Sequence, residues 1–90
     1  MSLTFKSGKL YKIKIPIYFF VGSMPRADAA GIVMDAYDTV GKDCGDLFIF
    51  LELQKHRFTT VFIFLDSQGR LVWDSTPNTT SYVSYFEEAY

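Results

Sequence analysis

The chain has 90 residues, of which 49% are apolar and 18% aromatic, and its formal net charge is −1. This length suits one domain, residues 1–90, and is too short for two domains that each bury a core of their own. The composition argues against a disordered chain, and the near-neutral charge argues against general attraction to nucleic acid or membranes. The single cysteine, Cys44, cannot form an internal disulfide, so we expect a cytoplasmic protein.

The first predicted element is a strand from Leu10 to Val21. Apolar residues alternate there with Lys12 and Lys14, as they do in a half-buried strand. Because Pro16 cannot donate a hydrogen bond to a neighbouring strand, we expect an edge position or a bulge at this point. The alternation and the proline also make a signal peptide the weaker interpretation. Residues 3–5 are a candidate for an extra N-terminal strand.

A helix is predicted next, from about Pro25 to Val40. Pro25 suits the first turn of a helix, Asp28 would lie near its positive N-terminal end, and Gly41 is a natural stop. At the helical repeat, the apolar residues of this segment fall on one arc and the acidic residues on the opposite one. We therefore expect this helix to pack on a sheet.

Three strands follow, at Leu47–Leu53, Phe58–Leu65 and Arg70–Asp74. The polar segments between them, residues 54–57 and 66–69, are short enough for hairpin turns, which predicts an antiparallel meander. A last helix is expected from about Thr79 to the end of the chain. The predicted fold class is α+β, a two-layer sandwich of order β-α-β-β-β-α.

The expected turns decide which side chains share a face of the meander. One face collects Leu47, Ile49, Leu51, Phe62, Phe64, Leu71 and Trp73. The opposite face collects Phe48, Phe50, Val61, Ile63 and Val72. Two helices on one side would leave the second face uncovered, and an exposed apolar face is typical of a partner interface. These last five residues are therefore the candidate interface.

No catalytic or metal-binding group stands out. His56 is the single histidine, and it lacks the further ligands that a zinc site needs. Cys44 lies between Asp43 and Asp46, whose carboxylates do not activate a thiol for catalysis. We therefore expect no enzyme activity, no metal and no cofactor.

Basic residues suggest a second kind of site. Residues 1–26 carry five basic and no acidic side chains, and Lys55, His56 and Arg57 follow one another in a predicted turn. Lys12 and Lys14, together with that turn, are candidates for binding nucleic acid or another polyanion. Solvated lysines that protect an edge strand are the more ordinary interpretation.

The sequence thus favours a small non-enzymatic binding or regulatory module that acts through protein contact. We expect it to form a homodimer or to bind another protein, and we expect no membrane partner, since no apolar run approaches the length that crosses a bilayer. Polyanion binding is the alternative.

Overall fold

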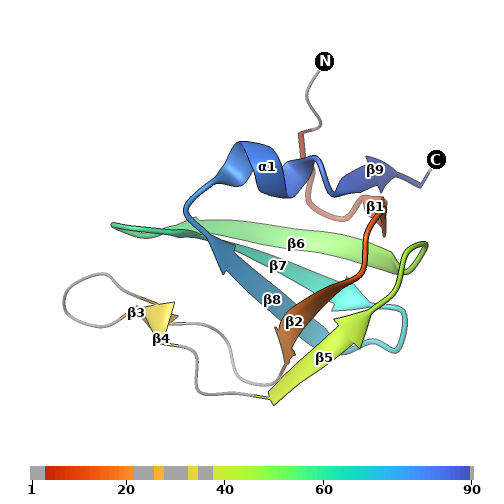
Figure 1. Ribbon diagram of the computed structural model, residues 1–90, viewed down its shortest axis with the longest axis horizontal. Helices are drawn as coiled ribbons and strands as arrows, with labels where there is room; N and C mark the ends of the chain where they lie inside the picture. The colour runs from red at the N-terminus through yellow and green to blue at the C-terminus, as the bar shows by residue number, and fades with distance from the viewer. Residues whose placement is uncertain (1–3, 22–25, 28–32, 35–37, 90) are drawn as a thin grey trace.

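The computed structural model describes residues 4–21, 26–27, 33–34 and 38–89. Nearly all of its regular structure is β (Figure 1). The strands are β1 (Leu10–Ile13), β2 (Ile17–Val21), β3 (Arg26–Ala27), β4 (Val33–Met34), β5 (Asp38–Lys42), β6 (Leu47–Lys55), β7 (Thr60–Asp66), β8 (Leu71–Thr76) and β9 (Phe86–Glu88). The helix of the described chain, α1, covers Thr79–Val83.

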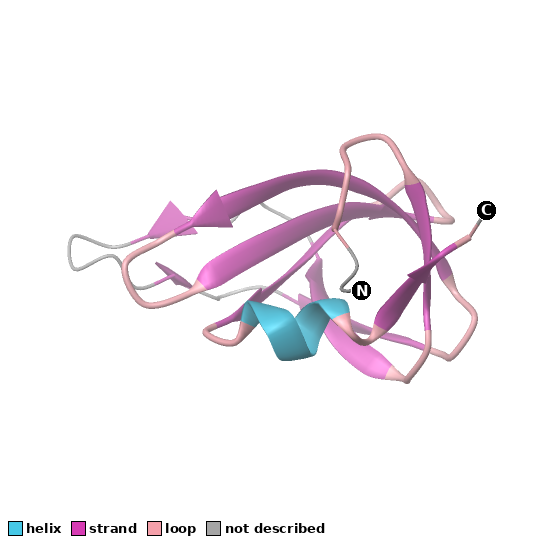
Figure 2. Ribbon diagram, turned by 90° about the horizontal axis from the view of Figure 1, so that it is seen from above, coloured by secondary structure: helices cyan, strands magenta, loops and turns pink. Residues whose placement is uncertain are grey.

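The predicted two-layer α+β sandwich is wrong. Seven strands form one sheet in the order β5-β2-β8-β7-β6-β1-β9, in which every neighbouring pair is antiparallel. β3 and β4 pair separately. The sheet is strongly curled, and α1 lies against one of its faces (Figures 1 and 2). We call this the inner face and the opposite one the outer face.

A bend in a long two-stranded ribbon produces the curl. The predicted strand Leu10–Val21 is divided at residues 14–16 into β1 and β2, which pair with β6 and β5 respectively. The register is unchanged across the break, since Leu10 lies opposite Ile49 and Val21 opposite Asp38 at the same offset. Pro16 interrupts the ladder at the bend, where a bulge or an edge position was expected.

The predicted helix at 25–40 is wrong wherever the structure describes it. Arg26–Ala27 pairs with Val33–Met34, and Asp38–Lys42 is a strand on the free edge of β2. The remainder of that prediction, at residues 23–25, 28–32 and 35–37, lies outside the described residues. Strand pairing overrides the helical periodicity because β2, rich in β-branched and aromatic residues, needs partners on both edges.

The predicted meander is confirmed: β6, β7 and β8 are consecutive antiparallel neighbours. The face assignment fails for β7 alone. Val61 and Ile63 lie on the outer face, and Phe62 and Phe64 on the inner face, the reverse of the prediction. Two local features, one at each edge of β7, account for this reversal.

The first feature is a β-bulge in β6. Phe50 lies opposite Phe64 and Glu52 opposite Ile63, so one strand gains a residue at Leu51. The second is the β7–β8 turn, in which Asp66 faces Arg70 and Gly69 has a φ of 77°. This three-residue turn with a left-handed glycine shifts the register by one residue from the predicted four-residue loop.

The last helix is much shorter than predicted. It begins at Thr79 as expected, with the Asn78 side chain accepting a hydrogen bond from the Ser81 amide at 3.1 Å, but it ends at Val83. The chain then extends as β9 along β1. Phe86 enters the core while Glu87 and Glu88 remain exposed at the edge of the sheet.

The main core fills the inner face and is largely aromatic. Phe64 stands at its centre, with ring centroids 5.2 Å from Phe86 and 5.6 Å from both Phe48 and Phe50. Tyr82 of α1 stacks on Phe62 at 4.6 Å. The core residues on this side are Tyr11, Ile13, Phe19, Phe48, Phe50, Phe62, Phe64, Val72, Tyr82 and Phe86. A smaller cluster of Val61, Ile63 and Trp73 is buried on the outer face.

Candidate functional site

The candidate interface residues do not share one exposed face. Phe48, Phe50 and Val72 belong to the inner core, and Val61 and Ile63 belong to the outer cluster. Each is buried within the single chain, with at most 4% of its surface exposed. The arrangement on one face was wrong because β7 is reversed.

An exposed apolar surface nevertheless exists on the outer face, made by different residues. Leu10, Ile49, Leu65 and Leu71 lie opposite one another in register across β1, β6, β7 and β8. Cross-strand partners of this kind share a face. Leu47 and Leu51 extend the row along β6. We call this set the outer stripe: Leu10, Leu47, Ile49, Leu51, Leu65 and Leu71.

The outer stripe is partly solvent-exposed. Leu47 and Ile49 each expose 38% of their surface, whereas Leu51 and Leu71 are half-buried against the Val61, Ile63 and Trp73 cluster. The sequence placed Leu47, Ile49, Leu51 and Leu71 together, but predicted that helices would cover them. It missed Leu10 and Leu65, whose placement depends on the register.

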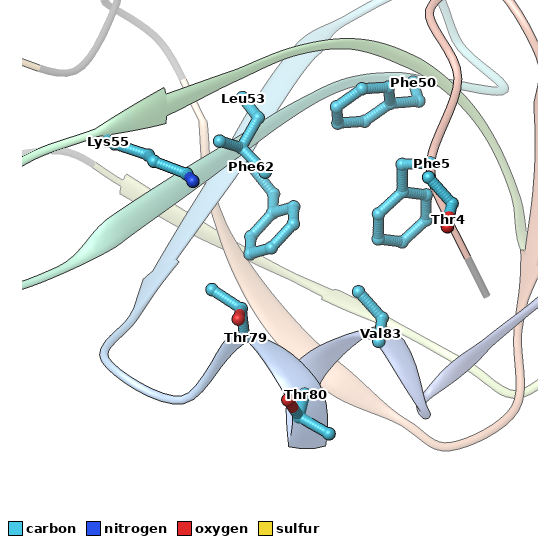
Figure 3. A pocket seen from close by; sticks show the side chains of 9 residues that line it. All are labelled: Thr4, Phe5, Phe50, Leu53, Lys55, Phe62, Thr79, Thr80 and Val83. Atoms are coloured by element: carbon cyan, nitrogen blue, oxygen red, sulfur yellow. The ribbon is translucent and has the colours of Figure 1, made fainter. Parts of the chain in front are cut away.

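The second candidate site is a pocket of about 380 Å³ between the inner face, α1 and the N-terminal segment (Figure 3). Its lining residues are Thr4, Phe5, Phe50, Leu53, Lys55, Phe62, Thr79, Thr80 and Val83. The apolar side chains form the floor and walls, and the polar groups lie toward the rim (Figure 3). Such a mixture is typical of small-molecule sites, whose volumes begin at roughly 300 Å³.

The bulge in β6 directs two side chains into this pocket. Beyond Leu51 the alternation of the strand is reversed, so Leu53 lies opposite Phe62 and Lys55 opposite Thr60 on the inner side. The Ser7 hydroxyl donates a hydrogen bond to the Leu51 carbonyl at 2.7 Å, which satisfies the bulged peptide. The pocket could not be predicted from the sequence, because a bulge leaves no clear pattern there.

The polyanion candidates lie in two separate places. Lys12 belongs to β1 and pairs with Leu47 at the start of β6, whereas Lys55, His56 and Arg57 follow at its end. At about 3.3 Å per residue these groups are roughly 25 Å apart. Lys14 is exposed and stands just beyond the end of β1.

The two groups also differ in their contacts. Lys12 forms an exposed ion pair with Glu87 at 3.4 Å. His56 contacts the Gln54 side chain at 3.3 Å, and the Arg57 guanidinium lies 5.2 Å from the centre of the Phe58 ring. The structure therefore does not join the lysines and the turn into one basic surface.

The single cysteine and the single histidine also lie apart. Cys44 is exposed in the β5–β6 connection, and His56 follows β6 at the opposite end of that nine-residue strand. In the described part of the chain, no three His, Cys, Asp or Glu side chains cluster closely enough to hold a metal ion. None of the described helices is long and apolar enough to cross a membrane.

Asp66 anchors a buried ionic network next to the core. Its carboxylate accepts hydrogen bonds from the Lys42 ammonium and the Arg70 guanidinium, each at 2.9 Å, and from the Gln68 and Arg70 amides. Burial raises the pKa of Asp66, but these donors outweigh it and lower the pKa to about 2. The network holds β5, β7 and the β7–β8 turn together.

Asp74 has the opposite electrostatic setting. It lies opposite Phe62 on the inner side of β8, close to Tyr82, and burial raises its pKa to about 6 despite opposing hydrogen bonding from the Ser75 amide. The Tyr82 hydroxyl is buried without a well-formed hydrogen bond to any described residue. Burial and the nearby Asp74 charge raise the pKa of Tyr82. Asp74 and Tyr82 therefore interact electrostatically but with poor hydrogen-bond geometry.

No protein-family model matches the sequence, and neither the curated proteins nor the solved structures contain a match to it.

Proposed function

We propose that this protein is a small cytoplasmic binding module without enzyme activity that acts through protein contact and associates with a second copy of itself. The observation that carries the proposal is the outer stripe, an in-register row of aliphatic side chains across four strands. Exposed apolar residues gathered in one place are typical of interaction surfaces, whereas isolated ones are ordinary.

The β9 edge of the sheet is less suited to association than the outer face. β9 is three residues long and carries Glu87 and Glu88, and short charged strands discourage further strand pairing. A net charge of −1 also gives little repulsion between two copies. Packing of one outer stripe on another would cover the apolar side chains of both copies.

Charge favours one orientation of the two copies. On the outer face, Lys12 stands beside Leu47 at the start of the stripe, where it also pairs with Glu87, and Glu52 follows Leu51 at its end. If the two β6 strands run antiparallel across a twofold axis, Lys12 of each copy faces Glu52 of the other. A parallel arrangement would place like charges together, which is unfavourable.

Sedimentation equilibrium over roughly 10 to 500 µM tests the proposal. We expect a reversible monomer–dimer equilibrium with a dissociation constant on the order of 10 to 100 µM, since the exposed stripe is small. Ile49→Lys should weaken the dimer at least tenfold, because it would bury an unpaired charge between two apolar surfaces. Far-UV circular dichroism checks that the variant stays folded.

Phe58→Lys provides the matched control. Phe58 is also an exposed apolar residue, at 58%, but it lies in the β6–β7 turn away from the stripe. The same charge introduced there should leave dimerisation unchanged. A wild-type protein that remains a strict monomer at high micromolar concentration would refute self-association.

A further inference from the structure

We propose that the pocket beneath α1 binds a linear amphiphilic carboxylate, a fatty acid of medium chain length. Its hydrocarbon tail would lie against Phe5, Phe50 and Phe62, and its carboxylate would reach the Lys55 ammonium at the rim (Figure 3). This inference is independent of self-association, since the pocket is on the inner side of the sheet and the outer stripe on the opposite side.

The apolar wall of the pocket is already assembled. The Phe5 ring stacks on Phe50 with centroids 5.0 Å apart, and its edge meets Phe62 at 5.6 Å. Phe50 and Phe62 are themselves buried, at 4% and 1% exposed. Rings held by one another lose little conformational entropy when a ligand arrives, so this wall is suited to binding an apolar chain.

The apolar surface of the pocket is incompletely covered at Leu53. The bulge turns Leu53 onto the inner side beside Phe62, yet 40% of its surface remains exposed. A hydrocarbon chain in the pocket would cover it. At about 30 Å³ for each group the size of a water molecule, 380 Å³ has room for roughly ten to twelve non-hydrogen atoms, the size of an eight- to ten-carbon acid.

The rim of the pocket carries one uncompensated positive charge. Within the described residues Lys55 forms no ion pair, whereas Lys9, Lys12 and Lys42 each pair with a carboxylate. None of the lining residues is acidic. An anionic head group is therefore favoured over a cationic one.

A side-chain hydroxyl on the Lys55 side of the pocket, that of Thr79, suits a carboxylate (Figure 3). Thr79 and Thr80 line the same pocket, and hydroxyl groups can donate hydrogen bonds to carboxylate oxygens. Lys55 and Thr79 come from β6 and α1, which face each other across the opening (Figure 3). One cation and one neutral donor match a singly charged head group.

Titration of ¹⁵N-labelled protein with decanoate, below its micelle concentration, tests the proposal by chemical-shift changes. We expect saturable shifts at Phe50, Leu53, Phe62 and Thr79. Decanol should bind about fivefold more weakly, the size of a partly exposed ion pair. Shortening the acid by two carbons should weaken binding roughly tenfold or more, given the contribution of each buried methylene.

Two lysine variants separate charge recognition from simple apolar binding. Lys55→Met should remove the preference for decanoate over decanol, and Lys55→Arg should retain it. Lys14→Met is the matched control, because Lys14 is an exposed lysine at the β1–β2 bend, outside the pocket, and the preference should persist.

Three results would overturn the proposal. One is the lack of saturable shifts up to the solubility limit of the acid, and another is an unchanged decanoate preference in Lys55→Met. The third is a set of shifts confined to the outer stripe, which would indicate that the acid binds the dimerisation surface.

Discussion

Two aspartates, the buried Asp66 and the half-buried Asp74, have pKa values shifted in opposite directions. Asp66, held by Lys42 and Arg70, has a pKa lowered to about 2, so its contribution to stability is present above its ordinary pKa and is lost as the pH falls toward 2. Asp74, whose pKa is raised to about 6, is neutral at low pH and imposes a cost once it ionises. Together these two residues make the folded state most stable near pH 4.

The Asp74→Asn variant should remove the loss of stability that the ionisation of Asp74 causes as the pH rises. At pH 7.5 the wild-type carboxylate is half-buried and charged, so we expect the neutral variant to be more stable by about 2 kcal/mol. At pH 4 the wild-type carboxyl is mostly protonated in the folded state, and the two proteins should have nearly equal free energies of unfolding. Urea denaturation at both pH values measures the difference, and equal stabilities at pH 7.5 would contradict the assigned shift.

At the scale of elements, the sequence predicted the strands of the meander better than the register in which they pair. The meander of β6, β7 and β8 and the start of α1 at Thr79 follow from apolar runs and turn residues, and both are confirmed. The side of the sheet on which each β7 side chain lies depends on a one-residue change of register at each edge of that strand. Neither the bulge at Leu51 nor the three-residue turn before Arg70 changes the apolar pattern, so composition could not reveal them.

Gly69 should therefore be important for the β7–β8 turn. Its φ of 77° lies in the left-handed region, so Gly69→Ala should cost about 1 kcal/mol of unfolding free energy. Gly41→Ala is the control, since the added Cβ would meet only the ring of Tyr18, at 3.2 Å, and Tyr18 is 74% exposed and free to move. Denaturant unfolding of both variants measures the costs, and an equal or greater loss for Gly41→Ala would contradict the account.

At the scale of the molecule, the prediction from sequence relied too much on helical periodicity. The segment from Pro25 to Val40 arranges its apolar residues on a helical arc, yet Asp38–Lys42 completes the sheet at the edge of β2. Long-range pairing of this kind is decided by partners distant in sequence, which a local window does not contain. The curl of the sheet could not be predicted for the same reason, since it arises from the pairing of the two strands of the bent ribbon.

The candidate sites were only partly predictable for the same reason. Leu47, Ile49, Leu51 and Leu71 were correctly placed on one face, because β6 and β8 keep the expected alternation. Their exposure was not predicted, since two long helices were expected and the described part of the chain has one short helix. The pocket required the bulge and the N-terminal segment together.

The central claim is that two copies meet through the outer stripe with their β6 strands antiparallel. Isotope-filtered NOE spectroscopy on an equal mixture of labelled and unlabelled protein, at a concentration where dimer is present, tests it most directly. We predict intermolecular contacts between the methyl groups of Leu47 in one copy and Leu51 in the other, together with contacts between the two Ile49 side chains. Intermolecular contacts located at β9 or at the β6–β7 turn, with none in the stripe, would contradict the claim.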